Sequence, residues 1–122
     1  MPNKLIFDKR SGLYKVEASG IITLDDILET IYELEKVISS DKLIYFLIDT
    51  WRQTSKLSIL DADRVASALS GKNRVRYAIL STDNHLSLNE QEIIEKLASH
   101  RGKSIRVFTD RDVAVNWLIS EH

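Results

Sequence analysis

The side chains best suited to acid–base chemistry lie together in one short polar segment, Asp83-Asn84-His85. Histidine is the side chain that most readily exchanges a proton near neutral pH. Asp and Asn also form turns by bonding their own backbone, so a plain loop between a strand and a helix explains the same residues. We therefore treat Asp83, Asn84 and His85 as candidate ligand- or partner-binding residues and predict no catalytic residue.

Metal and cofactor chemistry has little support in the chain. His85, His100 and His122 are far apart, and none has the spacing to a second ligand that would direct both at one ion. There is no cysteine, which excludes disulfides and thiolate ligands. The glycines are isolated rather than grouped in a phosphate-binding loop, and no serine has the glycine neighbours of a nucleophile elbow. We expect no metal and no cofactor.

A second group of candidates, Thr50, Trp51 and Arg52, follows the apolar run Leu43–Ile48. We expect residues 51–57 to form an irregular polar loop. An exposed indole is a common anchor for a partner or ligand. The alternative is that Trp51 folds back and covers the end of the sheet.

Ser58 is the candidate phosphorylation and binding residue at the start of the next helix. With Asp61 it forms a capping pair, and an N-cap serine is the simpler interpretation. A phosphate on Ser58 would meet free backbone amides and the positive end of the helix dipole.

The elements that position these residues follow from the hydrophobic pattern. Leu43–Ile48 is a continuous apolar run and predicts a central strand covered on both faces. The polar residues 9–12 end in a glycine and predict a hairpin. The predicted strands are Lys4–Asp8, Leu13–Ser19, Leu43–Ile48, Arg74–Ser81 and Ser104–Thr109.

Four helices are predicted from caps and apolar stripes. Thr23, Ser58, Ser87 and Asp110 are N-caps, and Gly71 and Gly102 end two of the helices. The side chains expected to face the core are Ile27, Ile31, Leu34 and Ile38; Ala62, Val65, Ala66 and Leu69; Ile93, Ile94, Leu97 and Ala98; and Val113, Ala114, Trp117 and Leu118.

The resulting order is β-β-α-β-α-β-α-β-α over one domain, residues 1–122. Strands joined through a helix are parallel, so we expect an α/β fold with a mostly parallel sheet of about five strands and one antiparallel strand. Ligands of such sheets tend to bind outside the carboxyl ends of the strands.

The element order, with RYAILS at 76–81 and IRVFTDRDVAVNWL at 105–118, resembles the SpoIIAA-like family, relatives of the STAS domain. The resemblance implies a SpoIIAA-like fold and, as in some STAS domains, a protein partner controlled by phosphorylation within an Asp-Ser-Ser-Gly-like motif. The matching stretch here, residues 49–58, lacks that motif. Distant CRAL-TRIO relatives imply an apolar pocket, although their extra helices do not fit this length.

Composition and charge reduce the classes of function that remain open. The 122 residues are 43% hydrophobic and 29% charged, with a formal net charge of −1 that argues against nucleic acid as a partner. The opening residues predict neither a signal peptide nor a membrane span, so a cytoplasmic location is expected. We expect a non-enzymatic regulatory or protein-interaction domain, able to form a homodimer. A carrier of a small apolar or amphipathic ligand is the alternative, and an enzyme comes third.

Overall fold

The five strands of the protein form one sheet in the order β1-β2-β3-β4-β5, which is also their order in the chain. The computed structural model describes residues 3–38, 43–55, 58–69, 75–82 and 87–120. β1 pairs antiparallel with β2, and all other neighbours are parallel. The predicted α/β class and strand directions are confirmed. The strands are β1 (Asn3–Asp8), β2 (Leu13–Gly20), β3 (Ile44–Gln53), β4 (Val75–Leu80) and β5 (Ile105–Phe108).

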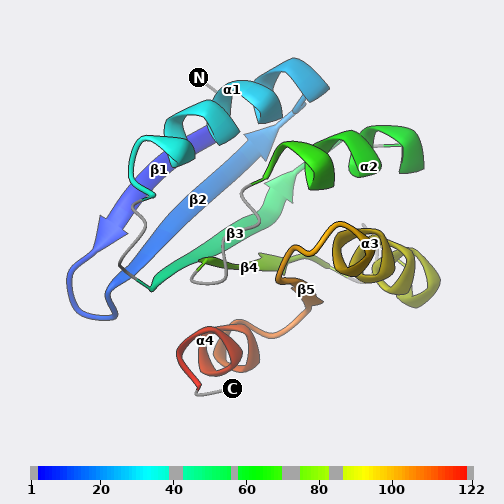
Figure 1. The fold of residues 1–122 in the computed structure, drawn as a ribbon. Coiled ribbons are helices and arrows are strands. Elements are labelled where there is room, and N and C mark those ends of the chain that lie inside the picture. The colour runs from blue at the N-terminus through cyan, green and yellow to red at the C-terminus, as the bar shows by residue number, and fades with distance from the viewer. Residues whose placement is uncertain (1–2, 39–42, 56–57, 70–74, 83–86, 121–122) are drawn as a thin grey trace.

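The helices lie in two layers on either side of this sheet (Figure 1). Each parallel step moves one strand further in the same direction, and right-handed crossovers then place all three connecting helices on one face. The last helix follows β5 without such a constraint and packs on the opposite face. The helices are α1 (Leu24–Glu35), α2 (Ile59–Ala68), α3 (Leu88–His100) and α4 (Arg111–Ile119).

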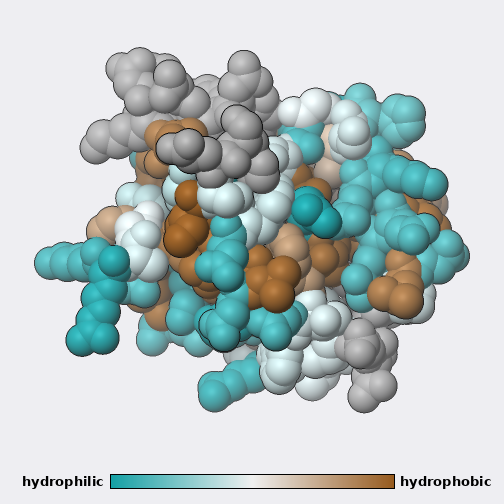
Figure 2. Space-filling view, turned by 90° about the horizontal axis from the view of Figure 1, so that it is seen from below, coloured by the Kyte–Doolittle hydropathy of each residue, from teal (hydrophilic) through white to brown (hydrophobic). Residues whose placement is uncertain are grey.

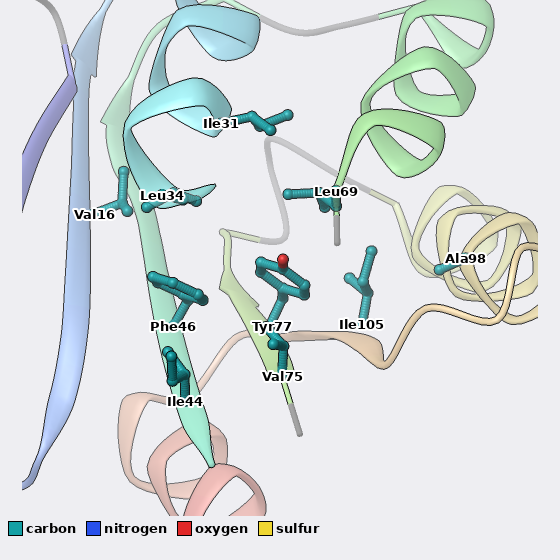
Figure 3. Close-up of a cluster of buried hydrophobic side chains, with 10 residues drawn as sticks. All are labelled: Val16, Ile31, Leu34, Ile44, Phe46, Leu69, Val75, Tyr77, Ala98 and Ile105. Atoms are coloured by element: carbon teal, nitrogen blue, oxygen red, sulfur yellow. The ribbon is translucent and has the colours of Figure 1, made fainter. Parts of the chain in front are cut away.

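The central strand β3 is buried on both faces, as its apolar run predicts. Phe46 points toward the three-helix layer and Leu47 toward α4, and both are almost fully buried. Phe46 also stacks on Tyr77 of β4, with ring centroids 5.3 Å apart, and contacts Tyr14 of β2 at 5.6 Å. Figure 3 shows Phe46 and Tyr77 side by side between the sheet and the helices. A row of rings therefore ties neighbouring strands together beneath α1.

The helix α4 covers the other face through Ala114 and Leu118, both fully buried. Trp117 is half-buried, and its ring contacts that of Phe108. Val113 was expected to face the core, and that prediction is wrong, because its side chain is half exposed while Val115 packs inward. Ala114, Trp117 and Leu118 pack against the sheet as predicted, and only Val113 is misplaced in the predicted stripe.

The predicted caps form as the sequence indicates. Thr23 and Ser87 each make a complete capping box, and Ser58 and Asp110 accept hydrogen bonds from the first turns of α2 and α4. Gly102 has a positive φ of 70° immediately after α3, a conformation that glycine adopts without strain. Gly71 lies outside the described residues.

The strand β3 runs to Gln53, so the prediction of an irregular loop from Trp51 onward is wrong for its first three residues. The pairing of β3 with β2 shows one extra residue in β3. Glu17 pairs with Asp49, but Ser19, two residues further along β2, pairs with Arg52, which is three residues further along β3. A β-bulge of this kind adds a residue without ending the strand and turns the following side chains.

The helices α2 and α3 are joined by a bidentate ion pair. Arg101 donates from Nε and from a terminal nitrogen to the two carboxylate oxygens of Asp63, at 3.0 and 2.9 Å. Lys103 donates to the carbonyl of Leu69 at the end of α2. These bonds hold the two helices side by side above the sheet.

The surface on the side seen from below Figure 1 is mixed, with apolar residues in separate patches between hydrophilic ones (Figure 2). In the described part of the chain, no helix combines the length and the apolar character needed to cross a bilayer.

Replacing Phe46 with Ala tests the importance of the central strand. Because Phe46 is fully buried, we expect Phe46→Ala to lower the free energy of unfolding by about 3–5 kcal/mol. Phe7→Ala removes a half-exposed ring at the end of the same row and should cost less than about 1.5 kcal/mol. Urea denaturation measures both, and equal losses would contradict the assigned burial.

The Asp63–Arg101 pair makes an acid-dependent contribution to stability. Hydrogen bonding from Arg101 holds the pKa of Asp63 below its ordinary value of 3.8. The ionised carboxylate therefore stabilises the fold above that value, and this stabilisation is lost as the pH falls through the lowered pKa. Asp63→Asn should lower the melting temperature at pH 7 and reduce the further drop on acidification to pH 3. Glu29→Gln, an exposed change in α1, should do neither.

Candidate functional site

A cavity of about 160 Å³ lies between the sheet and the layer formed by α1, α2 and α3. All five strands contribute to its floor and the three helices form its roof. Apart from five polar side chains, its walls are aliphatic throughout: Val16, Ala18, Ile22, Ile27, Ile31, Leu34, Ile48, Ile59, Ala62, Val65, Ala66, Leu69, Ile79, Ile94 and Ile105. Protein interiors leave few voids larger than a water molecule, so this space is a feature of the fold that needs an explanation.

The polar side chains of the wall are mostly engaged with the protein itself. The Thr50 hydroxyl donates to the carbonyl of Leu80 at 2.8 Å, and the Gln53 amide donates to the carbonyl of Ser55 at 3.0 Å. Glu90 accepts from the backbone of Ser87 in the capping box of α3. These bonds leave the wall apolar in character, because the polar groups are directed to backbone partners.

The cavity reaches the surface beside the first turn of α2. Ile59 lines the cavity and is also 42% exposed, whereas Ile22 nearby is buried. The Ser55 hydroxyl holds Ile22 in place, because it accepts from the Ile22 N–H at 2.7 Å and donates to the Ile22 carbonyl at 2.9 Å. The opening therefore lies at the carboxyl ends of the strands, where the sheet topology predicts a ligand.

A second hollow, of about 260 Å³, lies on the other face of the sheet at the start of α4. Its walls carry charged residues around an exposed indole: Glu17, Asp49, Trp51, Arg52 and Arg111, with Ala18. Asp49 links two walls of this hollow. One of its carboxylate oxygens accepts from the Trp51 N–H at 3.0 Å, and the other pairs with Arg111. Trp51 is 55% exposed, so its indole does not fold back over the sheet.

The residues predicted as one site from the sequence are divided between these places. Thr50 lines the apolar cavity, whereas Trp51 and Arg52 both line the charged hollow. The bulge in β3 explains the division, because it directs two consecutive side chains to the same face. Ser58 is exposed and caps α2, which agrees with the simpler interpretation of that residue. Asp83, Asn84 and His85 lie outside the described residues.

Apart from Thr50, the residues that line the cavity carried no sign of function in the sequence. Ala62, Val65 and Ala66 form an ordinary apolar stripe, and such a stripe looks the same whether it packs tightly or borders a void. Asn3 and Gln53 also line the cavity and carried no recognisable motif. One available signal was the small size of Ala62 and Ala66 on a helix that faces large strand residues. Among the described residues, no three His, Asp or Glu side chains are grouped to hold a metal ion.

Comparison with solved structures identifies the fold. The chain is similar to the crystal structure of an uncharacterised protein of the DUF3478 family with a SpoIIAA-like fold, from Shewanella loihica PV-4. The TM-score is 0.61 at 19% sequence identity, and the match covers 95% of this chain and 91% of that chain. No protein-family model and no curated protein matches the sequence. The element order, the single antiparallel pair and this likeness together show that the chain has a SpoIIAA-like fold.

Proposed function

We propose that this chain is a non-catalytic binding domain that holds a small apolar molecule in the cavity between the sheet and α1–α3. The supporting observation is the aliphatic wall around about 160 Å³ of space. A cavity of similar size lined by Leu, Ile and Phe side chains stays dry and takes up benzene. Transfer of an apolar molecule from water into such a space is favourable by roughly 25 cal/mol per Å² of buried surface.

The non-catalytic part of the proposal rests on the side chains that border the cavity. Among the described residues that line it, Glu90 is the single ionisable group, and it caps α3. General acid–base catalysis needs a donor and an acceptor placed around the reacting atoms. This wall supplies apolar contact and a few neutral polar groups, which suits binding.

Filling the cavity tests the proposal. Ala66 lies on the wall and is buried, whereas Ala68 on the same helix is exposed. Toluene, as a probe, should raise the melting temperature of the wild type and of Ala68→Leu, because a ligand that binds only the folded state stabilises it. Ala66→Leu should abolish this rise, and so should the milder Ala62→Leu.

Two outcomes of the same experiment would contradict the proposal. A wild type that does not respond to toluene, or an equal response in Ala66→Leu, would show that the cavity does not bind apolar molecules. Circular dichroism of each variant confirms that the fold is retained.

Protein interaction, which the sequence favours first, is the second candidate, and the exposed Trp51 beside Arg52 supports it. Both residues border the charged hollow at the start of α4. Trp and Arg are the residue types most enriched where interfaces concentrate their binding energy. A regulatory role would use this surface for the partner and the cavity for a ligand that controls it.

The interaction hypothesis is tested with two exposed aromatic residues. Trp51→Ala should weaken the capture of a specific protein from cell extract by roughly 30-fold, the effect of losing an anchor residue. Tyr32→Ala changes another exposed aromatic residue, on α1, and should leave capture unchanged. Quantitative mass spectrometry of the retained proteins measures the difference, and identical sets for the two variants would remove Trp51 from the proposal.

A further inference from the structure

Asn3 carries a buried hydrogen-bond acceptor at the edge of the cavity. It lies on β1 opposite Ala18 of β2 and lines the cavity together with Thr30 of α1. Its side-chain oxygen Oδ1 is buried and has no hydrogen-bond partner among the described residues. Buried polar atoms are nearly always paired, so a lone acceptor at a cavity wall calls for a specific explanation.

The orientation of the Asn3 amide follows from its neighbours. The Thr30 hydroxyl donates its hydrogen to the carbonyl of Asp26 at 2.9 Å. Thr30 Oγ1 then has only lone pairs to offer Asn3, and the Asn3 Nδ2 group donates to it at 2.7 Å. The NH₂ group of Asn3 therefore faces α1, and Oδ1 is the atom that has no partner among the described residues.

Among the described residues, none donates a hydrogen bond to this oxygen. Ala18, Ile22 and Ile27 are aliphatic, and they line the cavity beside Asn3 and Thr30. We propose that the cavity takes an uncharged ligand with a hydroxyl or N–H group, which donates a hydrogen bond to Asn3 Oδ1 while its apolar body fills the space under the helices. This inference rests on the proposed binding function and adds the chemistry of the ligand.

The same geometry limits which ligands fit. A carboxylate would place its negative charge against the Asn3 carbonyl, and no Lys or Arg is found among the described residues that line the cavity. Burying such an unpaired charge is strongly unfavourable. The volume is close to that of a cavity that holds benzene, so the body of the ligand is about the size of one ring. Phenols, small alcohols and small cyclic N–H compounds meet these conditions.

Phenol and toluene form a matched pair of probes, because they have nearly the same shape and differ by a hydroxyl in place of a methyl group. The dissociation constants of both are measured by calorimetry or by ligand-observed NMR, for the wild type and for Asn3→Leu. Losing one hydrogen bond should weaken phenol relative to toluene by about 10-fold in Asn3→Leu. The ratio of the two constants cancels any change common to both probes, such as a small shift in the cavity wall.

A second measurement needs no variant. The side-chain carbonyl carbon of Asn3 should change its ¹³C resonance when phenol is added to the wild-type protein and should change far less with toluene, because only phenol donates to Oδ1. This readout holds even where Asn3→Leu fails to fold.

The outcomes separate the two proposals. Toluene binding with an unchanged ratio in Asn3→Leu, or with no response of the Asn3 carbonyl to phenol, would overturn the donor requirement and leave the apolar cavity in place. Absence of binding for both probes would overturn the cavity function and this inference together.

Discussion

The burial of β3 on both faces is the constraint on which the rest of the structure depends. Phe46 and Leu47 are adjacent in the chain and point to opposite faces, and both are almost completely removed from water. Neither can be buried unless helices cover both sides of the sheet. The two-layer arrangement, the position of β3 at the centre and the row of rings on the three-helix face all satisfy this requirement.

The strand order decides where open space remains in the fold. In many α/β proteins the strand order reverses, neighbouring helices lie on opposite faces, and a crevice opens between them. Here the strands follow one another in sequence order, so α1, α2 and α3 share one face and no such reversal occurs. These three helices cover the sheet, α2 presents the small residues Ala62 and Ala66 to it, and open space remains between the two layers.

The bulge in β3 is a small irregularity with a large consequence for the surface. In a regular strand Trp51 and Arg52 would point to opposite faces. The extra residue brings both to the charged hollow, while Thr50 and Gln53 remain on the cavity wall. The end of β3 therefore borders both an apolar cavity on one face of the sheet and an exposed aromatic and charged surface on the other.

The sequence by itself determined the element types, the hairpin, the helix starts and the central strand, because these depend on local periodicity and on caps such as Thr23 and Ser87 that act within one turn. It also determined the fold class, since strands alternating with helices form a parallel sheet. Only the tertiary structure decided that β3 continues through a bulge, that Val115 rather than Val113 faces the sheet, and that Asn3 meets Thr30 across 27 residues of chain. These features depend on the register between strands and on how closely helices pack, and neither can be predicted from the residues that are adjacent in the sequence.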